Sequence, residues 1–249
     1  LISETKSRWL QQLSSMDHED DDPGTTWNER ARKREPDRMS PRMAWRAIQT
    51  ALPTEAIISS DIGNNCAIGN AYPTFEEGRK YLAPGLFGPC GYGLPSIIGA
   101  KIAQRDTPVV GFAGDGAFGI SMNEMTACGR GEWPAITMVI FRNYQWGAEK
   151  RNTTLWFEDN FVGTELNLGV EYAKIADGCG LKGVQVRGMT ELTEILSRAI
   201  KEQMEDNITT FIEVVLNQEL GEPFRRDAMK KPNSIAGINL SDMKKQQIA

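Results

Sequence analysis

The sequence has few of the residue types that catalysis and zinc binding most often use. It contains a single histidine, His18, within the acidic run 17–22. This run and the mixed-charge stretch after it lack apolar periodicity, which is typical of a solvated connector rather than of a metal site. We therefore do not expect histidine-dependent triads or zinc sites, and any catalysis needs another acid–base system or a cofactor.

Paired cysteines, long apolar runs and excess positive charge are also missing. The four cysteines stand far apart without a C-x-x-C pair, which indicates free thiols in a reducing compartment. No apolar run reaches the ~18 residues of a membrane helix, and no signal peptide is visible. The net charge of −5 gives no support for nucleic-acid binding. We expect a cytoplasmic protein that binds neither nucleic acid nor membranes.

Apolar strands alternate with helical patterns from residue 40 onward, where Ser40-Pro41 is a strong helix start. We expect strands at 56–60, 80–83, 108–113, 135–141, 183–187 and 209–216, and helices at 41–51, 94–103, 120–129, 170–178 and 190–205. Because the strands are continuously apolar, the pattern predicts an α/β fold, a parallel sheet with helices on both faces.

The domain organisation follows from where this alternation begins and ends. We expect residues 1–39 to be a polar linker with a short helix at 3–13, residues 40–220 to be the folded domain, and 221–249 to be a tail. The chain begins at Leu1 rather than Met. We therefore interpret it as the latter part of a longer protein.

One glycine turn after a strand has a carboxylate in its middle. The stretch from Gly114 to Gly119 satisfies the dinucleotide fingerprint G-x-G-x-x-G. Asp115 within it would repel a diphosphate unless a cation lay between them. Asn143 follows the next strand, and the ends of parallel strands meet at one edge of a sheet. A carboxylate, an amide, a backbone carbonyl and phosphate oxygens suit Mg²⁺.

A Rossmann-type NAD site is the alternative interpretation of the same turn. Such a site needs an acidic residue at the end of the following strand to bind the ribose. The nearest candidate, Glu132, precedes Trp133-Pro134 instead of ending a strand. The magnesium interpretation is therefore favoured.

These motifs resemble those of a known family. The Gly114-Asp115-Gly116 turn followed by Asn143 resembles the diphosphate–metal motif of thiamine-diphosphate (ThDP) enzymes. The loop 88–95, GPCGYGLP, resembles the acetolactate synthase and pyruvate oxidase branch. Within that branch, the sequence looks most like the sulfoacetaldehyde acetyltransferases, through the runs GDGAFGISMNEMTA, EWPAITMVIFRNYQWGAEKRNTTLWF and LNQELGEPFRRDAMKKP. The likeness covers nearly all of residues 36–232.

The resemblance implies roles for individual residues. Mg²⁺ would be bound by Asp115, the Asn143 side chain and the main-chain oxygen of Gln145. The implied cofactor-binding residues are Gly63, Asn64, Asn65, Gly88, Cys90, Gly114, Gly116, Ala117, Asn143, Gln145, Trp146 and Gly147. Gly88 would offer its carbonyl to the cofactor's 4′-amino group. Cys90 stands where relatives place a larger apolar wedge that bends the cofactor; plain packing is the alternative for it.

The implied reaction joins sulfoacetaldehyde and inorganic phosphate to give acetyl phosphate and sulfite. Lys150 and Arg151 either contact these anionic substrates or form a solvated surface pair. Arg225 and Arg226 either cap the site or belong to the tail. No catalytic residue is expected in this chain, because the family's activating glutamate belongs to an N-terminal domain that we do not find here.

The active site of such a family lies between subunits of a homo-oligomer, a dimer or tetramer, so the chain alone would hold half a site. Two other functions remain open at this stage. One is a different ThDP enzyme, such as acetolactate synthase or an oxidase. The other is a non-catalytic ThDP-binding subunit.

Overall fold

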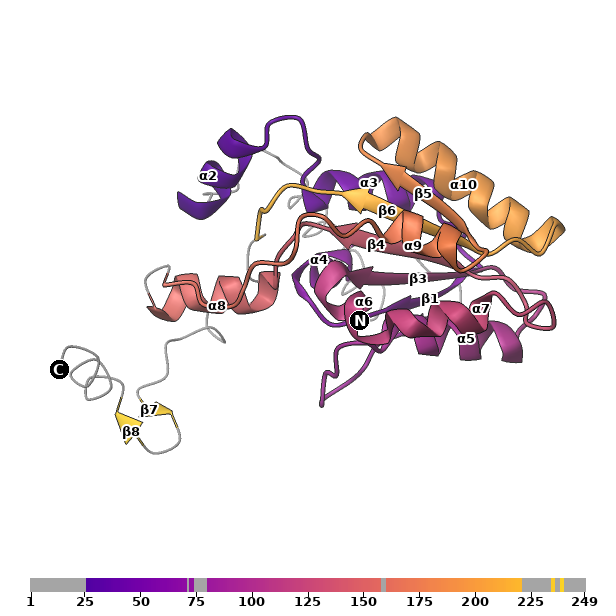
Figure 1. Cartoon of the computed structure of the whole chain (residues 1–249), viewed down its shortest axis with the longest axis horizontal. Coiled ribbons are helices and arrows are strands. Elements are labelled where there is room, and N and C mark those ends of the chain that lie inside the picture. The colour runs from indigo at the N-terminus through magenta and orange to yellow at the C-terminus, as the bar shows by residue number, and fades with distance from the viewer. Residues whose placement is uncertain are drawn as a thin grey trace, which may run out of the picture.

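The core of the fold is a six-stranded parallel sheet (Figure 1). The structure is a computed structural model that describes residues 26–70, 72–73, 80–157 and 160–220, and the backbone of 234–235 and 238–239. The strands are β1 (Ile57–Ser60), β2 (Tyr81–Leu82), β3 (Val109–Gly114), β4 (Thr137–Arg142), β5 (Lys182–Val186) and β6 (Thr210–Val215), in the order β2-β1-β3-β4-β6-β5. All neighbouring pairs are parallel. The predicted α/β fold class is confirmed.

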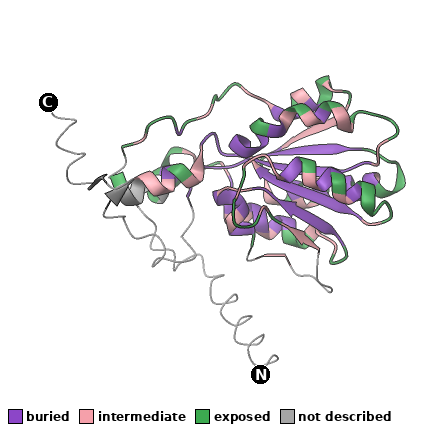
Figure 2. Cartoon of the chain, turned by 90° about the horizontal axis from the view of Figure 1, so that it is seen from below, coloured by how far each residue is buried: buried purple, intermediate pink, exposed green. Residues whose placement is uncertain are grey.

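Helices cover both faces of this sheet, and the four inner strands β1, β3, β4 and β6 are buried between them (Figure 2). The helices α3 (Pro41–Ala51) and α10 (Met189–Glu205) pack together on one face. The other face is covered by α5 (Gly93–Ala103), α6 (Asp115–Ser121), α7 (Met125–Cys128) and α9 (Tyr172–Gly178). Because side chains alternate along a strand, the residues of β3 divide between the two hydrophobic cores. Both faces of β3 are thus apolar, as its continuous apolar run predicted.

The predicted start of α3 is confirmed in detail. Ser40 is the N-cap, its Oγ accepts a hydrogen bond from the Met43 N–H at 3.2 Å, and Pro41 occupies the first helical position. Trp45 and Ile48 then face the core. The helix ends before Pro53, at the end of its apolar stripe.

The helix predicted at 120–129 is wrong in its boundaries. Helix α6 already begins at Asp115, a short 3₁₀ turn η2 (Met122–Glu124) follows, and α7 completes the segment. Glycines at 116 and 119 lower the helix propensity of the first turn, so the sequence placed its start too late. The carboxylate at the first position favours the helix there by facing its positive end.

Three further helices lie where the sequence predicted linker or loop. They are α2 (Thr26–Arg34), α4 (Asn64–Gly69) and α8 (Gly147–Phe157). None shows a strong apolar stripe, and α2 is held by polar contacts such as the 3.0 Å ion pair of Arg32 with Glu219. Tertiary contacts of this kind leave no periodic pattern in the sequence.

Some predictions fall on residues outside the described ranges. These are the helix at 3–13, the acidic run with His18, and the placement of Arg225 and Arg226. The short antiparallel pair of β7 (Ser234–Ile235) and β8 (Ile238–Asn239) is described by its backbone alone. The domain boundaries stay predictions. None of the helices in the described ranges is long and apolar enough to cross a membrane.

Candidate diphosphate and metal site

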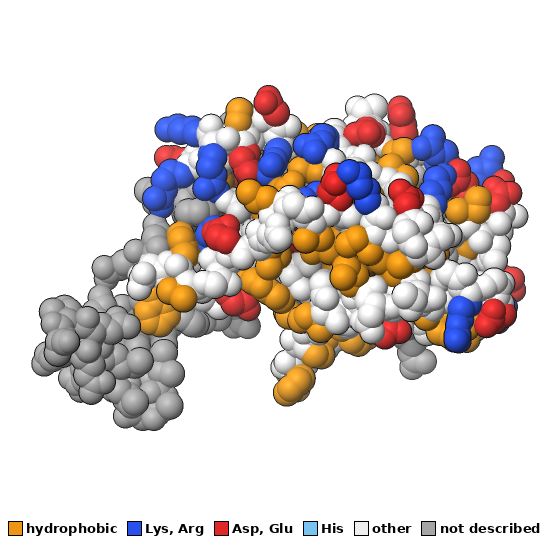
Figure 3. Space-filling model, in the orientation of Figure 1, with side chains coloured by type: hydrophobic (Ala, Val, Ile, Leu, Met, Phe, Trp, Pro, Cys, Tyr) orange, Lys and Arg blue, Asp and Glu red, His pale blue; other side chains and the backbone are white. Residues whose placement is uncertain are grey.

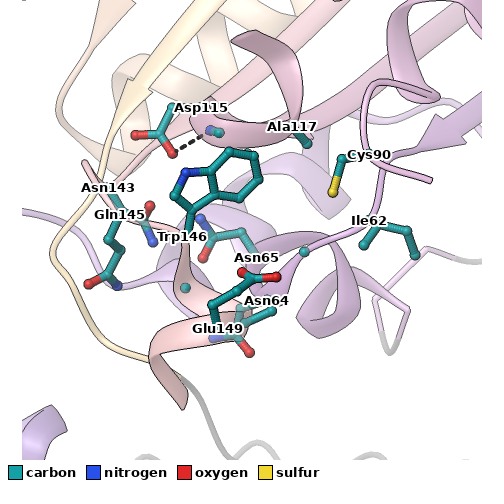
Figure 4. Close-up of a pocket in the computed structure, with 15 residues that line it drawn as sticks. Ile62, Asn64, Asn65, Cys90, Asp115, Ala117, Asn143, Gln145, Trp146 and Glu149 are labelled. Carbon is teal, nitrogen blue, oxygen red and sulfur yellow. Dashed lines mark hydrogen bonds between the residues drawn. The ribbon is translucent and has the colours of Figure 1, made fainter. Parts of the chain in front are cut away.

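A hollow that is open to solvent lies where β1, β3 and β4 end (Figure 4). Between β1 and β3 the chain makes β2 on the opposite side of β1, so the loops after β1 and β3 diverge at a switch point of the sheet. The residues that line the hollow are Ile62, Gly63, Asn64, Asn65, Cys90, Gly114, Asp115, Gly116, Ala117, Asn143, Gln145, Trp146, Gly147, Ala148 and Glu149. The three loops that the sequence predicted to meet do meet here.

Asp115 is the buried carboxylate at the centre of this arrangement. Only 2% of it is exposed, and its two oxygens accept backbone N–H groups from Gly116 at 3.0 Å and Tyr144 at 2.6 Å. Burial raises the pKa of Asp115 to about 7, although these hydrogen bonds act in the opposite direction. A cation beside the carboxylate would offset the cost of its burial.

Asn143 and Gln145 follow β4 on the same side of the hollow, and both are buried. Between them, Tyr144 adopts the left-handed conformation with φ 61°, and its N–H donates to Asp115. The guanidinium groups of Arg38 and Arg142 lie 4.7 and 4.6 Å from the centre of the Tyr144 ring. These cation–π contacts stabilise a backbone conformation that a residue with a side chain rarely adopts.

The first turns of α4 and α6 bring further residues to the hollow. Asn64 Nδ2 and Asn65 Oδ1 are buried and have no hydrogen-bond partner among the residues that the structure describes. Gly116 leaves room for the Trp146 indole, because a Cβ at position 116 would lie 2.9 Å from that ring. Gly63, the N-cap of α4, has a φ of 142° that favours glycine.

Cys90 reaches the hollow from the glycine-rich loop. Asp61 at the end of β1 holds that loop by accepting N–H groups from Gly91 at 3.1 Å and Gly93 at 2.7 Å. Burial, followed by the carboxylates of Asp61 and Glu149, raises the pKa of the Cys90 thiol. Whether Cys90 bends a cofactor or only packs stays a prediction.

Gly88, in the same loop, does not line the hollow, unlike the other predicted cofactor-binding residues. Its φ of 60° requires a left-handed turn, which suits glycine. The role of its carbonyl stays a prediction.

Lys150 and Arg151 do not line the hollow either, and the interpretation as a solvated pair is wrong. Lys150 is fully buried and forms an ion pair with Glu165, and desolvation lowers its pKa. Arg151 is half-buried and donates from Nη1 to Asn64 Oδ1 at 3.0 Å. The unexpected helix α8 explains both positions, because it turns these side chains inward.

The sequence did not single out Ile62, Ala148 and Glu149, which also line the hollow. It also missed Tyr172, whose hydroxyl donates to the main-chain oxygen of Asp115 at 3.1 Å. Ile62 and Ala148 are next to predicted site residues in the sequence, so this proximity could have indicated them. Tyr172 lies far from Asp115 in the sequence and gave none.

Comparison with known proteins identifies the region that carries this hollow. Residues 61–214 match the family model described as "Thiamine pyrophosphate enzyme, C-terminal TPP binding domain". A solved thiamine diphosphate-dependent 4-hydroxybenzoylformate decarboxylase from Rhodococcus jostii RHA1 matches 74% of this chain and 34% of its own, with a TM-score of 0.65. At 22% identity, this match shows a shared fold alone.

Two curated relatives are much more similar in sequence. A probable sulfoacetaldehyde acetyltransferase of Rhizobium meliloti (strain 1021) is 75% identical over 99% of this chain. The sulfoacetaldehyde acetyltransferase of Roseovarius nubinhibens is 74% identical over 99% of the chain. The chain spans 42% and 41% of the lengths of these two relatives. The resemblance inferred from the sequence is confirmed.

Proposed function

Because the chain belongs to the thiamine pyrophosphate enzymes, as a C-terminal TPP binding domain, we propose that its hollow binds the diphosphate of ThDP together with Mg²⁺. The observation that carries the proposal is the buried Asp115 carboxylate, which faces the same hollow as Asn143 and Gln145. A carboxylate, an amide and a backbone carbonyl are hard oxygen donors of the kind that Mg²⁺ selects. The unpartnered Asn64 Nδ2 is a donor of the kind that a phosphate oxygen accepts.

In this proposal each part of the chain has a separate task. Asp115, the Asn143 side chain and the Gln145 main-chain oxygen hold the metal. Gly63, Asn64 and Asn65 lie against the diphosphate, and the N–H groups at the start of α6 add anion stabilisation. When bound, the cofactor supplies the carbanion chemistry, whereas the protein supplies anchorage and orientation.

We further propose that the complete protein converts sulfoacetaldehyde and inorganic phosphate to acetyl phosphate and sulfite. The support is the high identity to sulfoacetaldehyde acetyltransferases along nearly the whole chain. Acetolactate synthesis or another ThDP-dependent reaction is the alternative, because regions outside this chain also contribute to substrate selection. The described residues carry only the diphosphate and metal half of the proposed site.

The other half is proposed to come from a pyrimidine-binding domain of a partner subunit. Leu86 and Phe87, at the tip of the glycine-rich loop, are fully or almost fully exposed, with 109% and 92% of their reference area. Figure 3 shows hydrophobic side chains gathered on the face where α6 lies. Exposed apolar surface next to a site is typical of an interface. This surface supports a homo-oligomer whose site lies between subunits.

A product assay tests the proposed reaction. The complete protein, with ThDP, Mg²⁺, sulfoacetaldehyde and phosphate, is expected to release sulfite and to leave pyruvate unconsumed. The isolated chain is expected to show negligible turnover, because we expect the glutamate that activates the cofactor to lie in a domain outside this chain. Pyruvate consumption without sulfite release by the complete protein would favour the alternative enzyme. Robust turnover by the isolated chain would contradict the proposal that this chain carries only half of the active site.

A further inference from the structure

Asn64 carries an amide whose two ends are in different surroundings. Its Oδ1 accepts a hydrogen bond from Arg151 at 3.0 Å, whereas its Nδ2 is buried with no partner among the described residues. Only 5% of Asn64 is exposed, and the residue lines the hollow. A buried donor without a partner costs free energy, so this Nδ2 is available for a ligand.

An amide side chain can present either its oxygen or its nitrogen to a ligand by turning over. Turned over, Asn64 would place an acceptor oxygen beside an anion and lose a donor. Arg151 prevents this, because a guanidinium donates and never accepts hydrogen bonds. The hydrogen bond to Arg151 therefore selects the orientation in which Nδ2 is the free donor.

Arg151 contacts Asn64 on the side away from the hollow. It comes from α8, it does not line the hollow, and its Nε is buried without a partner in the described part of the chain. Desolvation lowers its pKa, and the nearby Glu149 carboxylate acts in the opposite direction. Among the described residues, the Arg151 guanidinium donates a hydrogen bond to Asn64 alone. Burying a charge is costly, so a guanidinium held in such surroundings indicates a specific task.

We infer that Arg151 is a positioning residue, which fixes the Asn64 amide so that Nδ2 donates to the cofactor diphosphate. This inference rests on the proposed function, because it takes ThDP as the ligand. It assigns Arg151 a role through Asn64 in place of the direct substrate contact that the sequence suggested. Through this hydrogen bond, α8 contacts the segment that follows β1.

A double-mutant cycle, measured by calorimetric titration of ThDP in the presence of Mg²⁺ into the complete protein, tests the inference. Arg151→Met and Asn64→Ala are each expected to weaken ThDP binding about tenfold, the size of one charge-assisted hydrogen bond. The double variant is expected to bind no more weakly than Asn64→Ala alone. Arg151→Lys, which keeps a donor, is expected to retain most of the affinity.

The matched control is Lys201→Met, which removes one positive charge from the exposed surface of α10 and is expected to leave ThDP affinity unchanged. Thermal melting of every variant establishes that it is folded. Unchanged affinity in Arg151→Met would overturn the inference, and so would an additive loss in the double variant, which would indicate direct contact with the cofactor. A raised KM for phosphate at unchanged ThDP affinity would overturn it too.

Failure of the proposed function gives a different result from failure of the inference. Wild-type protein that binds no ThDP would contradict the function, and the inference with it. Wild-type protein that binds ThDP normally, combined with an unaffected Arg151→Met variant, would contradict the inference alone.

Discussion

At the scale of single residues, the polar groups that line the hollow differ in hydrogen bonding from those just behind it. Asp61 has its carboxylate satisfied by backbone N–H groups, so it orders the loop that carries Cys90. Asn64, Asn65 and Gln145 each keep one buried polar atom without a partner among the described residues. Each such atom costs about 1–3 kcal/mol when it is left unsatisfied. These three residues line the same hollow, which is the residue-level support for a polar ligand.

The residue types alone were enough to predict part of this site. Asp115 could be found because a carboxylate within a glycine turn is chemically unusual, and Asn143 because it follows the next strand. The hydrogen bond between Arg151 and Asn64 could not be found, because its partners are 87 positions apart and neither residue type requires the other. Fully buried Lys150 was missed because a lysine in a polar stretch usually remains in solvent.

The raised pKa of Asp115 predicts a pH dependence of Mg²⁺ binding. The metal needs the ionised carboxylate, so metal and proton compete below the pKa of about 7 and do not compete above it. With ThDP saturating, the apparent affinity for Mg²⁺ is expected to fall by up to about tenfold per pH unit below that value. Calorimetry in buffers of different ionisation enthalpy measures the accompanying proton release.

That proton release is expected to approach one proton per metal ion near pH ~6 and to vanish near pH ~8.5. Magnesium affinity that does not change across this interval would contradict the assignment of Asp115 as a ligand with a raised pKa. Protons are released rather than taken up because, in the metal-free state, burial favours the protonated carboxyl group of Asp115.

At the scale of elements, the sequence predicted the helices and strands that pack into the two cores of the sheet. These elements carry a regular apolar pattern in the sequence. The amphipathic α10 and the apolar β4 are examples, since each buries residues at its own regular spacing. It did not predict α4 and α8, whose positions depend on contacts with other elements rather than on a periodic apolar pattern. Trp45 of α3 donates from Nε1 to the Asn65 main-chain oxygen in α4 at 2.7 Å. Such a contact fixes a helix without producing periodicity.

Gln203 of α10 offers a test at this scale. Its side chain accepts from the Val109 N–H at 2.9 Å and donates to the Val109 oxygen at 2.7 Å and to Thr137 Oγ1 at 2.9 Å. It therefore satisfies backbone groups at the start of β3. Gln203→Leu keeps the volume but leaves these groups unpaired, so we expect a loss of about 3 kcal/mol in the free energy of unfolding.

Urea unfolding followed by circular dichroism measures this loss. Lys201→Leu, on the exposed side of the same helix, is the control and is expected to change the free energy of unfolding by less than about 0.5 kcal/mol. A Gln203→Leu variant as stable as the wild type would show that the contacts to β3 are not needed for stability.

At the scale of the whole molecule, the strand order places the hollow where the loops after β1 and β3 separate. The sequence predicted that these loops share an edge with the end of β4, but it could not give the order of the strands. That order depends on which strand pairs with which, and similar apolar runs carry little information about their neighbours. The matching family region, residues 61–214, covers all the residues that line the hollow.

The central claim is that Asp115 holds Mg²⁺, which in turn holds the diphosphate of ThDP. Calorimetric titration of the complete protein with ThDP, in the presence and absence of Mg²⁺, tests it most directly, with NAD as the competing ligand. The wild type is expected to bind ThDP only with Mg²⁺ and to bind no NAD. Asp115→Ala is expected to lose this binding while its circular dichroism spectrum stays unchanged. Retained ThDP affinity in Asp115→Ala, or binding that does not depend on Mg²⁺, would contradict the account.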